Sequence, residues 1–243
     1  MQKLDILAFG AHPDDVELGC GGTLLAAVAE GKKIGIIDLT QGELGTRGTV
    51  ADRLKEASLA GDMIGATVRE NLGMKDGFFV NDQAHQMMII EVIRQYQPDI
   101  ILCNAPEDRH PDHGRAAKLV ADAAFLAGLI KVQTTNNGAA QTAWRPTHVF
   151  HYIQSRNLQP NFVVDISAFM DKKMESILAY TSQFYNPNSS EPNTFISSDS
   201  FLQFIKGRAK EFGQQIGVAY AEGFISEKML GIQSFDGLIQ KTT

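Results

Sequence analysis

The sequence predicts an α/β fold, a Rossmann-like three-layer sandwich in which helices cover both faces of a mostly parallel sheet. Strand-like and helix-like segments alternate along residues 1–130, which is the order expected of such a sheet. The strand-like segments are apolar almost throughout, as in parallel strands that are buried on both faces. Polar or glycine-rich loops follow several of these strands, at the edge where ligands bind in open α/β sheets.

The first strand is predicted over Leu4–Gly10, a short apolar run, and the first helix over Val16–Glu30, where leucine and valine recur at helical spacing. Gly31 ends this helix. The same two patterns predict the other elements. The remaining predicted strands are Lys32–Thr40, 66–71, Asp99–Ala105, 147–153 and 161–166, and the remaining helices are Ala51–Ile64, Gln83–Tyr96, Arg115–Leu129, 168–182 and 201–217.

The chain is predicted to form a single domain over residues 1–243, because it contains no repeat and no low-complexity linker. The regular alternation stops near residue 130, where longer polar loops begin. We expect residues 130–243 to complete the sheet and cover a site at its edge.

Composition excludes several classes of protein. The formal net charge is −6 and there is no long run of Lys or Arg, which argues against nucleic acid or an anionic membrane as the main partner. The two cysteines are too few for a disulfide scaffold. No apolar run approaches the ~20 residues of a membrane span, and the N-terminus does not resemble a signal peptide. These features predict a cytoplasmic protein.

Charged side chains crowd the end of the first predicted strand. The stretch AHPDDVELGCGG places His12, Asp14, Asp15 and Glu17 within six residues. Carboxylates this close repel one another unless a positive charge or water separates them. A metal ion, a basic partner or simple solvent exposure would each relieve the repulsion.

A second cluster, RHPDHG at residues 109–114, follows the fourth predicted strand. The carboxyl ends of parallel strands share one edge of the sheet, so the two clusters are expected to meet. His12, Asp15 and His113 then form a set of two histidines and one carboxylate, which suits a catalytic zinc ion with a fourth position left for water.

The remaining polar residues of the clusters suit proton transfer. Asp14 and Asp112 lie beside the expected ligands, and a carboxylate in such a position can act as a general base. His110 could serve as an acid or stabilise an oxyanion, with Asp112 holding its ring in the required tautomer.

The first cluster allows two other interpretations. Asp14 or Asp15 could simply cap a helix, with Glu17 favouring the helix dipole. GCGG followed by Asp38 resembles a dinucleotide fingerprint, but the acids would occupy the helix N-terminus where a pyrophosphate binds. We expect the glycines Gly19, Gly21 and Gly22 to permit close packing of the helix instead.

AHPDD together with HPDH on this fold resembles the PIG-L/LmbE-like zinc deacetylases. The longer stretches LDILAFGAHPDDVELGCGGTL, DLTQGELGTRGT and GVAYAEGF are similar to the branch that acts on N-acetylglucosaminyl-malate in bacillithiol biosynthesis. The resemblance implies a hydrolase that removes the N-acetyl group from an N-acetylglucosamine conjugate. Another N-acetylated sugar, such as a chitooligosaccharide or an antibiotic precursor, is the alternative substrate. A non-catalytic metal- or nucleotide-binding module is the alternative outside enzymes.

The resemblance also implies roles for individual residues. His12, Asp15 and His113 would hold zinc, with iron(II) as the other possible metal, Asp14 would be the general base, and Asp112 would orient His110. Some relatives have a tyrosine where this chain has Asp108, so any further oxyanion donor must come from elsewhere. A malate aglycone would need cations, for which Arg53 and Arg109 are expected because a guanidinium binds a carboxylate through two hydrogen bonds. Family members commonly form hexamers, so a homo-oligomer is expected.

Overall fold

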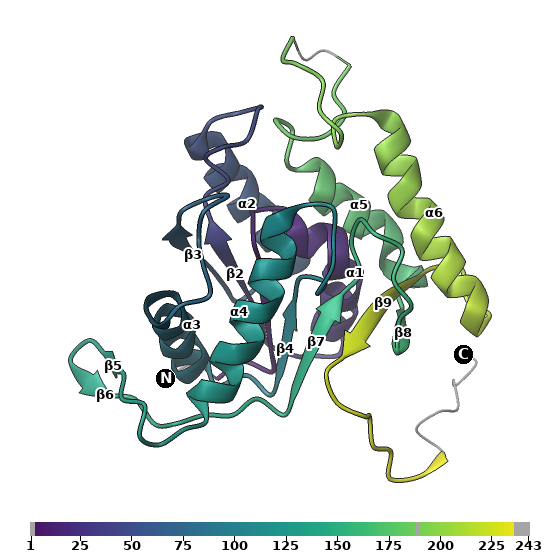
Figure 1. Cartoon of the computed structure of the whole chain (residues 1–243). Coiled ribbons are helices and arrows are strands. Elements are labelled where there is room, and N and C mark those ends of the chain that lie inside the picture. The colour runs from purple at the N-terminus through teal and green to yellow at the C-terminus, as the bar shows by residue number, and fades with distance from the viewer. Residues whose placement is uncertain (1–2, 188–189, 236–243) are drawn as a thin grey trace.

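A computed structural model describes residues 3–187 and 190–235 of the chain. Its larger sheet has seven strands in the order β3-β2-β1-β4-β7-β9-β8 (Figure 1). The strands from β3 to β7 in this order are parallel, and β9 is antiparallel to both of its neighbours. The strands are β1 (Ile6–Gly10), β2 (Ile34–Thr40), β3 (Val68–Met74), β4 (Ile100–Cys103), β7 (His148–Tyr152), β8 (Phe162–Asp165) and β9 (Ala221–Ser226).

Helices cover both faces of this sheet, giving the three layers that the sequence predicts. Helices α3 and α4 pack against one face, whereas α1, α2, α5 and α6 lie on the other (Figure 1). The helices are α1 (Asp15–Ala29), α2 (Val50–Ile64), α3 (Gln83–Tyr96), α4 (Pro111–Ala127), the 3₁₀ turn η1 (Ser167–Phe169), α5 (Met170–Leu178) and α6 (Asp199–Ile216).

Strand β1 shows why the predicted strands are apolar at every position. Leu7 and Phe9 pack into the core beneath α3 and α4. Ile6 and Ala8 point to the opposite face and pack against α1. Because successive side chains of a strand alternate between the two faces, a sheet covered on both faces requires apolar residues throughout.

The strand order places a crevice at the centre of the sheet. Strand β1 pairs with β2 on one side and with β4 on the other, so the connections after β1 and β4 leave the sheet in opposite directions. Such a reversal opens a crevice at the carboxyl ends of the two strands. The segments that follow β1 and β4 carry the two clusters found in the sequence.

The structure confirms the predicted α/β class and adds elements that the sequence analysis left as loop. Strand β9 lies beyond residue 217, where no element is predicted from the sequence, and β5 (Thr135–Asn136) pairs with β6 (Ala139–Ala140) in a small hairpin. Both cysteines are free and buried, in agreement with the expected lack of disulfides. Within residues 3–187 and 190–235, no helix has the length and apolar character needed to cross a bilayer.

Candidate functional site

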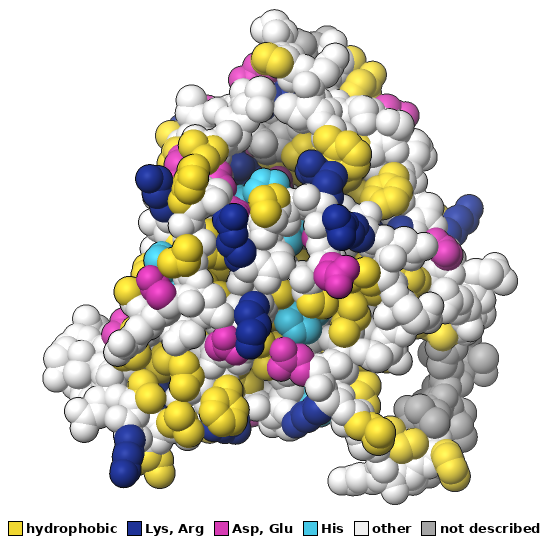
Figure 2. Space-filling view, in the orientation of Figure 1, with side chains coloured by type: hydrophobic (Ala, Val, Ile, Leu, Met, Phe, Trp, Pro, Cys, Tyr) yellow, Lys and Arg dark blue, Asp and Glu magenta, His cyan; other side chains and the backbone are white. Residues whose placement is uncertain are grey.

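A pocket of about 330 Å³ opens at the carboxyl ends of the parallel strands. Figure 2 shows histidine side chains inside this hollow, with hydrophobic and basic side chains around it. Most of the residues singled out from the sequence line the pocket. These are His12, Asp14, Asp15, Arg53, Arg109, His110 and His113.

The turn between β1 and α1 is fixed by backbone hydrogen bonds to side chains. The Ala11 N–H donates to Asn104 Oδ1 over 2.9 Å, and the His12 N–H donates to Asp15 Oδ2 over 3.0 Å. Asp14 adopts a φ of 114°, a region that residues with side chains rarely occupy. Strained backbone of this kind persists where the surroundings hold it, often at functional sites.

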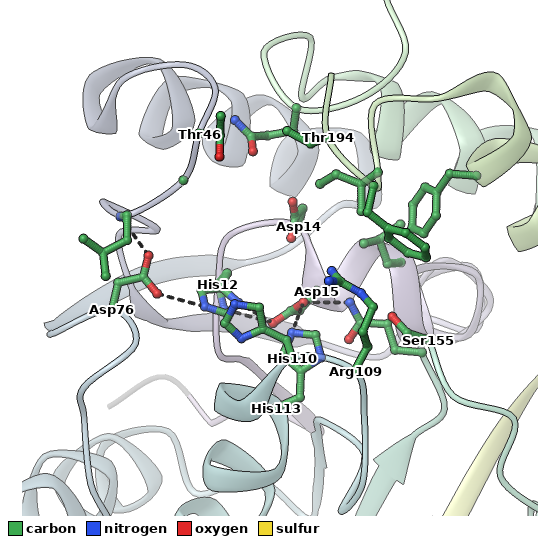
Figure 3. A pocket seen from close by; sticks show the side chains of 18 of the residues that line it. His12, Asp14, Asp15, Thr46, Asp76, Arg109, His110, His113, Ser155 and Thr194 are labelled. Carbon is green, nitrogen blue, oxygen red and sulfur yellow. Dashed lines mark hydrogen bonds and ion pairs between the residues drawn. The ribbon is translucent and has the colours of Figure 1, made fainter. Parts of the chain in front are cut away.

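Asp15 lies between two histidine rings (Figure 3). Its Oδ2 is 3.5 Å from His12 Nδ1, and its Oδ1 is 3.1 Å from His113 Nε2. Asn104 donates to Asp15 Oδ2 over 3.1 Å and Gln154 to Asp15 Oδ1 over 2.7 Å. Burial alone would raise the pKa of Asp15, but the two imidazoles lower it well below its usual range. The carboxylate is thus ionised and fixed in place.

Asp108 orients the His113 ring. This is the residue that stands where some relatives have a tyrosine, and no role was predicted for it from the sequence. The ring Nδ1 lies 2.6 Å from Asp108 Oδ2. The other oxygen of Asp108 accepts hydrogen bonds from the backbone N–H groups of Arg109, Ser155 and Arg156. Since Asp108 holds Nδ1 as a donor, Nε2 is the nitrogen that faces Asp15 and the pocket. Burial would lower the pKa of His113, yet the nearby carboxylates raise it to about 9.

Asp14 is buried beside the two expected ligands and contacts Arg53. The Arg53 guanidinium donates from Nη2 to Pro13 O over 2.5 Å and to Asp14 Oδ2 over 3.3 Å, and from Nη1 to Gly42 O over 3.3 Å. Burial raises the pKa of Asp14 to about 7, although the charge of Arg53 opposes the rise. The donors of Arg53 on its two terminal nitrogens are therefore engaged within the protein, whereas the sequence analysis expected them to bind substrate.

His110 caps the N-terminus of α4, with its Nδ1 accepting the backbone N–H of Asp112 over 3.3 Å. The sequence analysis expected the Asp112 carboxylate to hold the His110 ring, but it is the backbone N–H of Asp112 that contacts this ring. The Asp112 carboxylate accepts the Gly77 N–H over 2.8 Å, pairs with Arg115 over 2.7 Å and lies 3.4 Å from His12 Nε2. Because His110 Nδ1 accepts a hydrogen bond, the neutral ring carries its proton on Nε2 and can donate it.

Arg109 stands at the rim with its side chain exposed. Its guanidinium stacks on the Phe195 ring, 4.4 Å from the ring centroid. No hydrogen bond or ion pair of its guanidinium is found among the described residues, and both Arg109 and Phe195 line the pocket. Unlike Arg53, this guanidinium is available to a ligand.

The donor chemistry of the site fits a divalent metal ion. His12 and His113 face the Asp15 carboxylate, and second residues hold the carboxylate and the His113 ring in place, an arrangement typical of metal ligands. His12, His110 and His113 also present nitrogens within 4.8 Å of one another. The set expected from the sequence, His12, Asp15 and His113, is therefore a candidate metal site by its chemistry, whereas the histidine group that meets this distance contains His110 in place of Asp15.

Polar residues that support the site were not identified from the sequence. Asn104, Gln154 and Asp76 each follow the carboxyl end of a parallel strand within a few residues. Their position after a strand could have predicted that they lie at the site, because residues that follow parallel strands share one edge of the sheet. The contact of Asp108 with His113 depends on how the loop after β4 folds, so it could not be predicted from the sequence.

The glycines of α1 support packing rather than nucleotide binding. A Cβ on Gly19 would lie 2.1 Å from the Tyr152 ring, and one on Gly22 would lie 2.8 Å from Ile166. Gly21 has more room, with its nearest neighbour 3.7 Å from an added Cβ. All three lie within the helix and not in the preceding turn, so they do not form the glycine-rich turn of a dinucleotide site.

Comparison with known proteins finds relatives along most of the chain. The model of the PIG-L family, described as GlcNAc-PI de-N-acetylase, matches residues 7–124. The diacetylchitobiose deacetylase of Thermococcus kodakarensis is 28% identical over 228 residues, covering 90% of this chain and 81% of that protein. The crystal structure of a conserved protein of Thermus thermophilus is 36% identical, with a TM-score of 0.84, and the match covers 95% of this chain and 98% of that one.

Residues 7–124, which contain both motifs, therefore belong to the PIG-L family. The narrower resemblance to the malate branch is less well supported. A probable N-acetyl-α-D-glucosaminyl L-malate deacetylase 2 of Bacillus anthracis is 25% identical over 198 residues, covering 74% of this chain and 81% of that protein. This match is weaker than that to the chitobiose enzyme in identity and in the share of this chain covered, so the comparisons do not favour malate over a chitooligosaccharide.

Proposed function

We propose that this chain is a metal-dependent N-deacetylase that hydrolyses the acetamide of an N-acetylglucosamine conjugate. The observation that carries the proposal is the placement of Asp14 beside Asp15, which lies between the rings of His12 and His113 in one pocket. This places a candidate general base next to a candidate metal site, which is the combination that amide hydrolysis requires. The family model is named for de-N-acetylation and the relative from Thermococcus kodakarensis for deacetylation, which supports the same reaction.

His12, Asp15 and His113 would hold the metal, zinc in the first instance and iron(II) as the alternative. A bound divalent ion would supply polarisation of the acetyl carbonyl and acidification of the attacking water. Asp14 accepts the proton of that water. Burial raises the pKa of Asp14 to about 7, which suits a base that must gain and release a proton near neutral pH.

His110 stabilises the charge that develops on the carbonyl oxygen, because its Nε2–H is free to donate. The departing amine nitrogen must gain a proton as the C–N bond breaks. The proton that Asp14 removed from water is available for this transfer, so no further proton source is needed. The products are acetate and the free amino sugar.

The substrate is a conjugate of N-acetylglucosamine in which either malate or a second sugar occupies the aglycone position. The exposed guanidinium of Arg109 at the rim favours an anionic aglycone such as malate, because it can bind a carboxylate through two hydrogen bonds. The similarity to the diacetylchitobiose deacetylase favours a short chitooligosaccharide. A homo-oligomer, for which a hexamer is expected, stays a prediction.

The proposal is tested by measuring acetate release from three substrates: N-acetylglucosaminyl-malate, diacetylchitobiose and free N-acetylglucosamine. We expect release from at least one conjugate, loss of activity with a chelator, and recovery when zinc is returned. Metal binding without release from any N-acetylated sugar would indicate a non-catalytic metal-binding module. Activity that a chelator does not affect would contradict the metal-dependent mechanism.

A further inference from the structure

The two nitrogens of the His12 ring face different partners. Nδ1 lies 3.5 Å from Asp15 Oδ2, on the side of the expected metal. Nε2 lies 3.1 Å from Asp76 Oδ1 and 3.4 Å from Asp112 Oδ2. A carboxylate only accepts hydrogen bonds when it is ionised, so the two carboxylates beside Nε2 keep a proton on that nitrogen, and Nδ1 is the nitrogen whose lone pair becomes available when the ring is neutral.

Of the two carboxylates, Asp76 is the one directed at His12. Asp112 is closer to Arg115, at 2.7 Å, and accepts the Gly77 N–H. Asp76 forms no ion pair with Lys or Arg among the described residues, and the shortest contact of its carboxylate with another side chain is to His12. The Asp76 side chain is only 7% exposed, so water competes little for this contact.

Asp76 also binds the loop that forms one wall of the pocket. Its Oδ2 accepts the Leu44 N–H over 3.0 Å, and its own N–H donates to Glu43 Oε1 over 2.8 Å. Leu44, Gly45 and Thr46 line the pocket. One carboxylate therefore contacts both the ring of an expected metal ligand and the loop that lines the pocket (Figure 3).

We propose that Asp76 is a positioning residue that holds His12 with Nδ1 toward the metal and at the same time anchors the 41–48 loop. The inference rests on the proposed function, because it requires that His12 is a metal ligand. It explains why a residue 64 positions away in sequence lies buried against the ring. A carboxylate that accepts the second N–H of a ligating imidazole fixes its tautomer and raises its basicity, and its loss commonly weakens metal affinity by ~10- to 100-fold.

The same geometry allows a competing arrangement. His12, Asp76 and Asp112 present atoms within 4.8 Å of one another and could bind a cation directly. That would require Nε2 to lose its proton while Nδ1 ligates the first metal, which is unfavourable for an imidazole. We therefore assign a hydrogen bond to this contact, and metal stoichiometry decides between the two.

The test compares the variants Asp76→Ala and Asp76→Asn with wild type and with Asp122→Asn, a control whose carboxylate pairs with Lys118 away from the pocket. Zinc affinity is measured by chelator competition, and the ligand field by the visible spectrum of the cobalt-substituted protein. We expect zinc affinity to fall by ~10- to 100-fold in Asp76→Ala. Asp76→Asn should fall less, because an amide oxygen still accepts the N–H without supplying charge. The control should be unchanged.

Further measurements separate positioning from a general loss of stability. The cobalt spectrum should change in both Asp76 variants, whereas their metal-free melting temperatures should not follow the order of their zinc affinities. Amide exchange at Leu44 should be faster in Asp76→Ala, and KM should rise more than in the control.

Each outcome has a clear meaning. Wild-type affinity and an unchanged cobalt spectrum in Asp76→Ala would overturn the positioning role while leaving the proposed function intact. Two zinc ions per wild-type chain, with one lost in Asp76→Ala, would make Asp76 a ligand and also overturn it. Absence of zinc binding in wild type would overturn the metal site itself, and the inference with it.

Discussion

Replacement of Arg53 by alanine tests whether this arginine serves the substrate or the protein. Its side chain is about 6% exposed and bonds to Pro13 O, Gly42 O and the Asp14 carboxylate. Truncation removes the only cation paired with Asp14 among the described residues. Breaking a buried ion pair by removing one partner costs about 3–5 kcal/mol. We expect a loss of this size in the free energy of unfolding, measured by urea denaturation.

The same change should reduce activity toward all substrates by a similar factor. A charge-assisted hydrogen bond contributes about 1.5–3 kcal/mol, or roughly 10- to 150-fold in rate. Because Arg53 contacts Asp14, we expect kcat/KM to fall by this factor for the malate conjugate and for plain N-acetylglucosamine alike. Arg53→Lys should be intermediate, since one ammonium cannot reach all three acceptors.

Removal of Arg53 should also shift the pH dependence. The positive charge of Arg53 lowers the pKa of Asp14, so its loss raises that pKa. Asp14 must be ionised to accept a proton, and activity falls as the pH drops through its pKa. The acidic limb of kcat/KM should therefore move to higher pH in Arg53→Ala.

Arg109→Ala provides the matched comparison, because this guanidinium is exposed and has only an aromatic stacking partner among the described residues. The free energy of unfolding of the Arg109→Ala variant should change little, since an exposed cation–π contact contributes about 0.5–1 kcal/mol. The kcat/KM of this variant should fall selectively for the malate conjugate. Wild-type stability in Arg53→Ala, together with a loss of kcat/KM for the malate conjugate alone, would contradict the structural role of Arg53, because this arginine would then bind substrate as the sequence suggested.

Five other variants test the site and α1. His12→Ala and His113→Ala should each bind far less than one metal ion per chain in elemental analysis; full occupancy in both would exclude them as ligands. Asp14→Asn should retain metal and lose rate by ~10²-fold or more, whereas normal turnover would assign the base elsewhere. Gly19→Ala, whose Cβ would lie 2.1 Å from a buried aromatic ring, should lower the free energy of unfolding by about 3 kcal/mol, whereas Gly21→Ala should be tolerated.

The fold could be predicted because its signals are local. Strand β1 is apolar on both faces and α3 has an apolar face and a capping aspartate, so each element is specified by its own residues. The meeting of His12 with His113 was predictable for a topological reason. Both follow parallel strands, and the carboxyl ends of such strands share one edge of the sheet.

Strand β9 and the support around the site could not be predicted, because they depend on contacts between distant segments. The β9 segment AEGFIS is short and contains Gly223, where an added Cβ would lie 2.7 Å from Phe212. Its strand character comes from pairing with β7 and β8. The sequence likewise places Arg53 on a helix. It does not show whether the guanidinium binds Pro13 O or a ligand, because that depends on how the turn after β1 lies against α2.

The crowding of carboxylates that the sequence raised as a question is resolved by pairing. Each of the five buried aspartates at the site contacts at least one basic side chain. The pairs are Asp14 with Arg53, Asp15 with His12 and His113, Asp76 with His12, Asp108 with His113, and Asp112 with Arg115.

Burial would lower the pKa of His12 and of His113, but these carboxylates raise both. In the metal-free chain the two imidazoles therefore balance the acids by holding protons. A divalent ion at Asp15 would displace a proton from each ring while supplying the same positive charge, so the arrangement that tolerates the buried carboxylates without metal is also the one prepared to bind it.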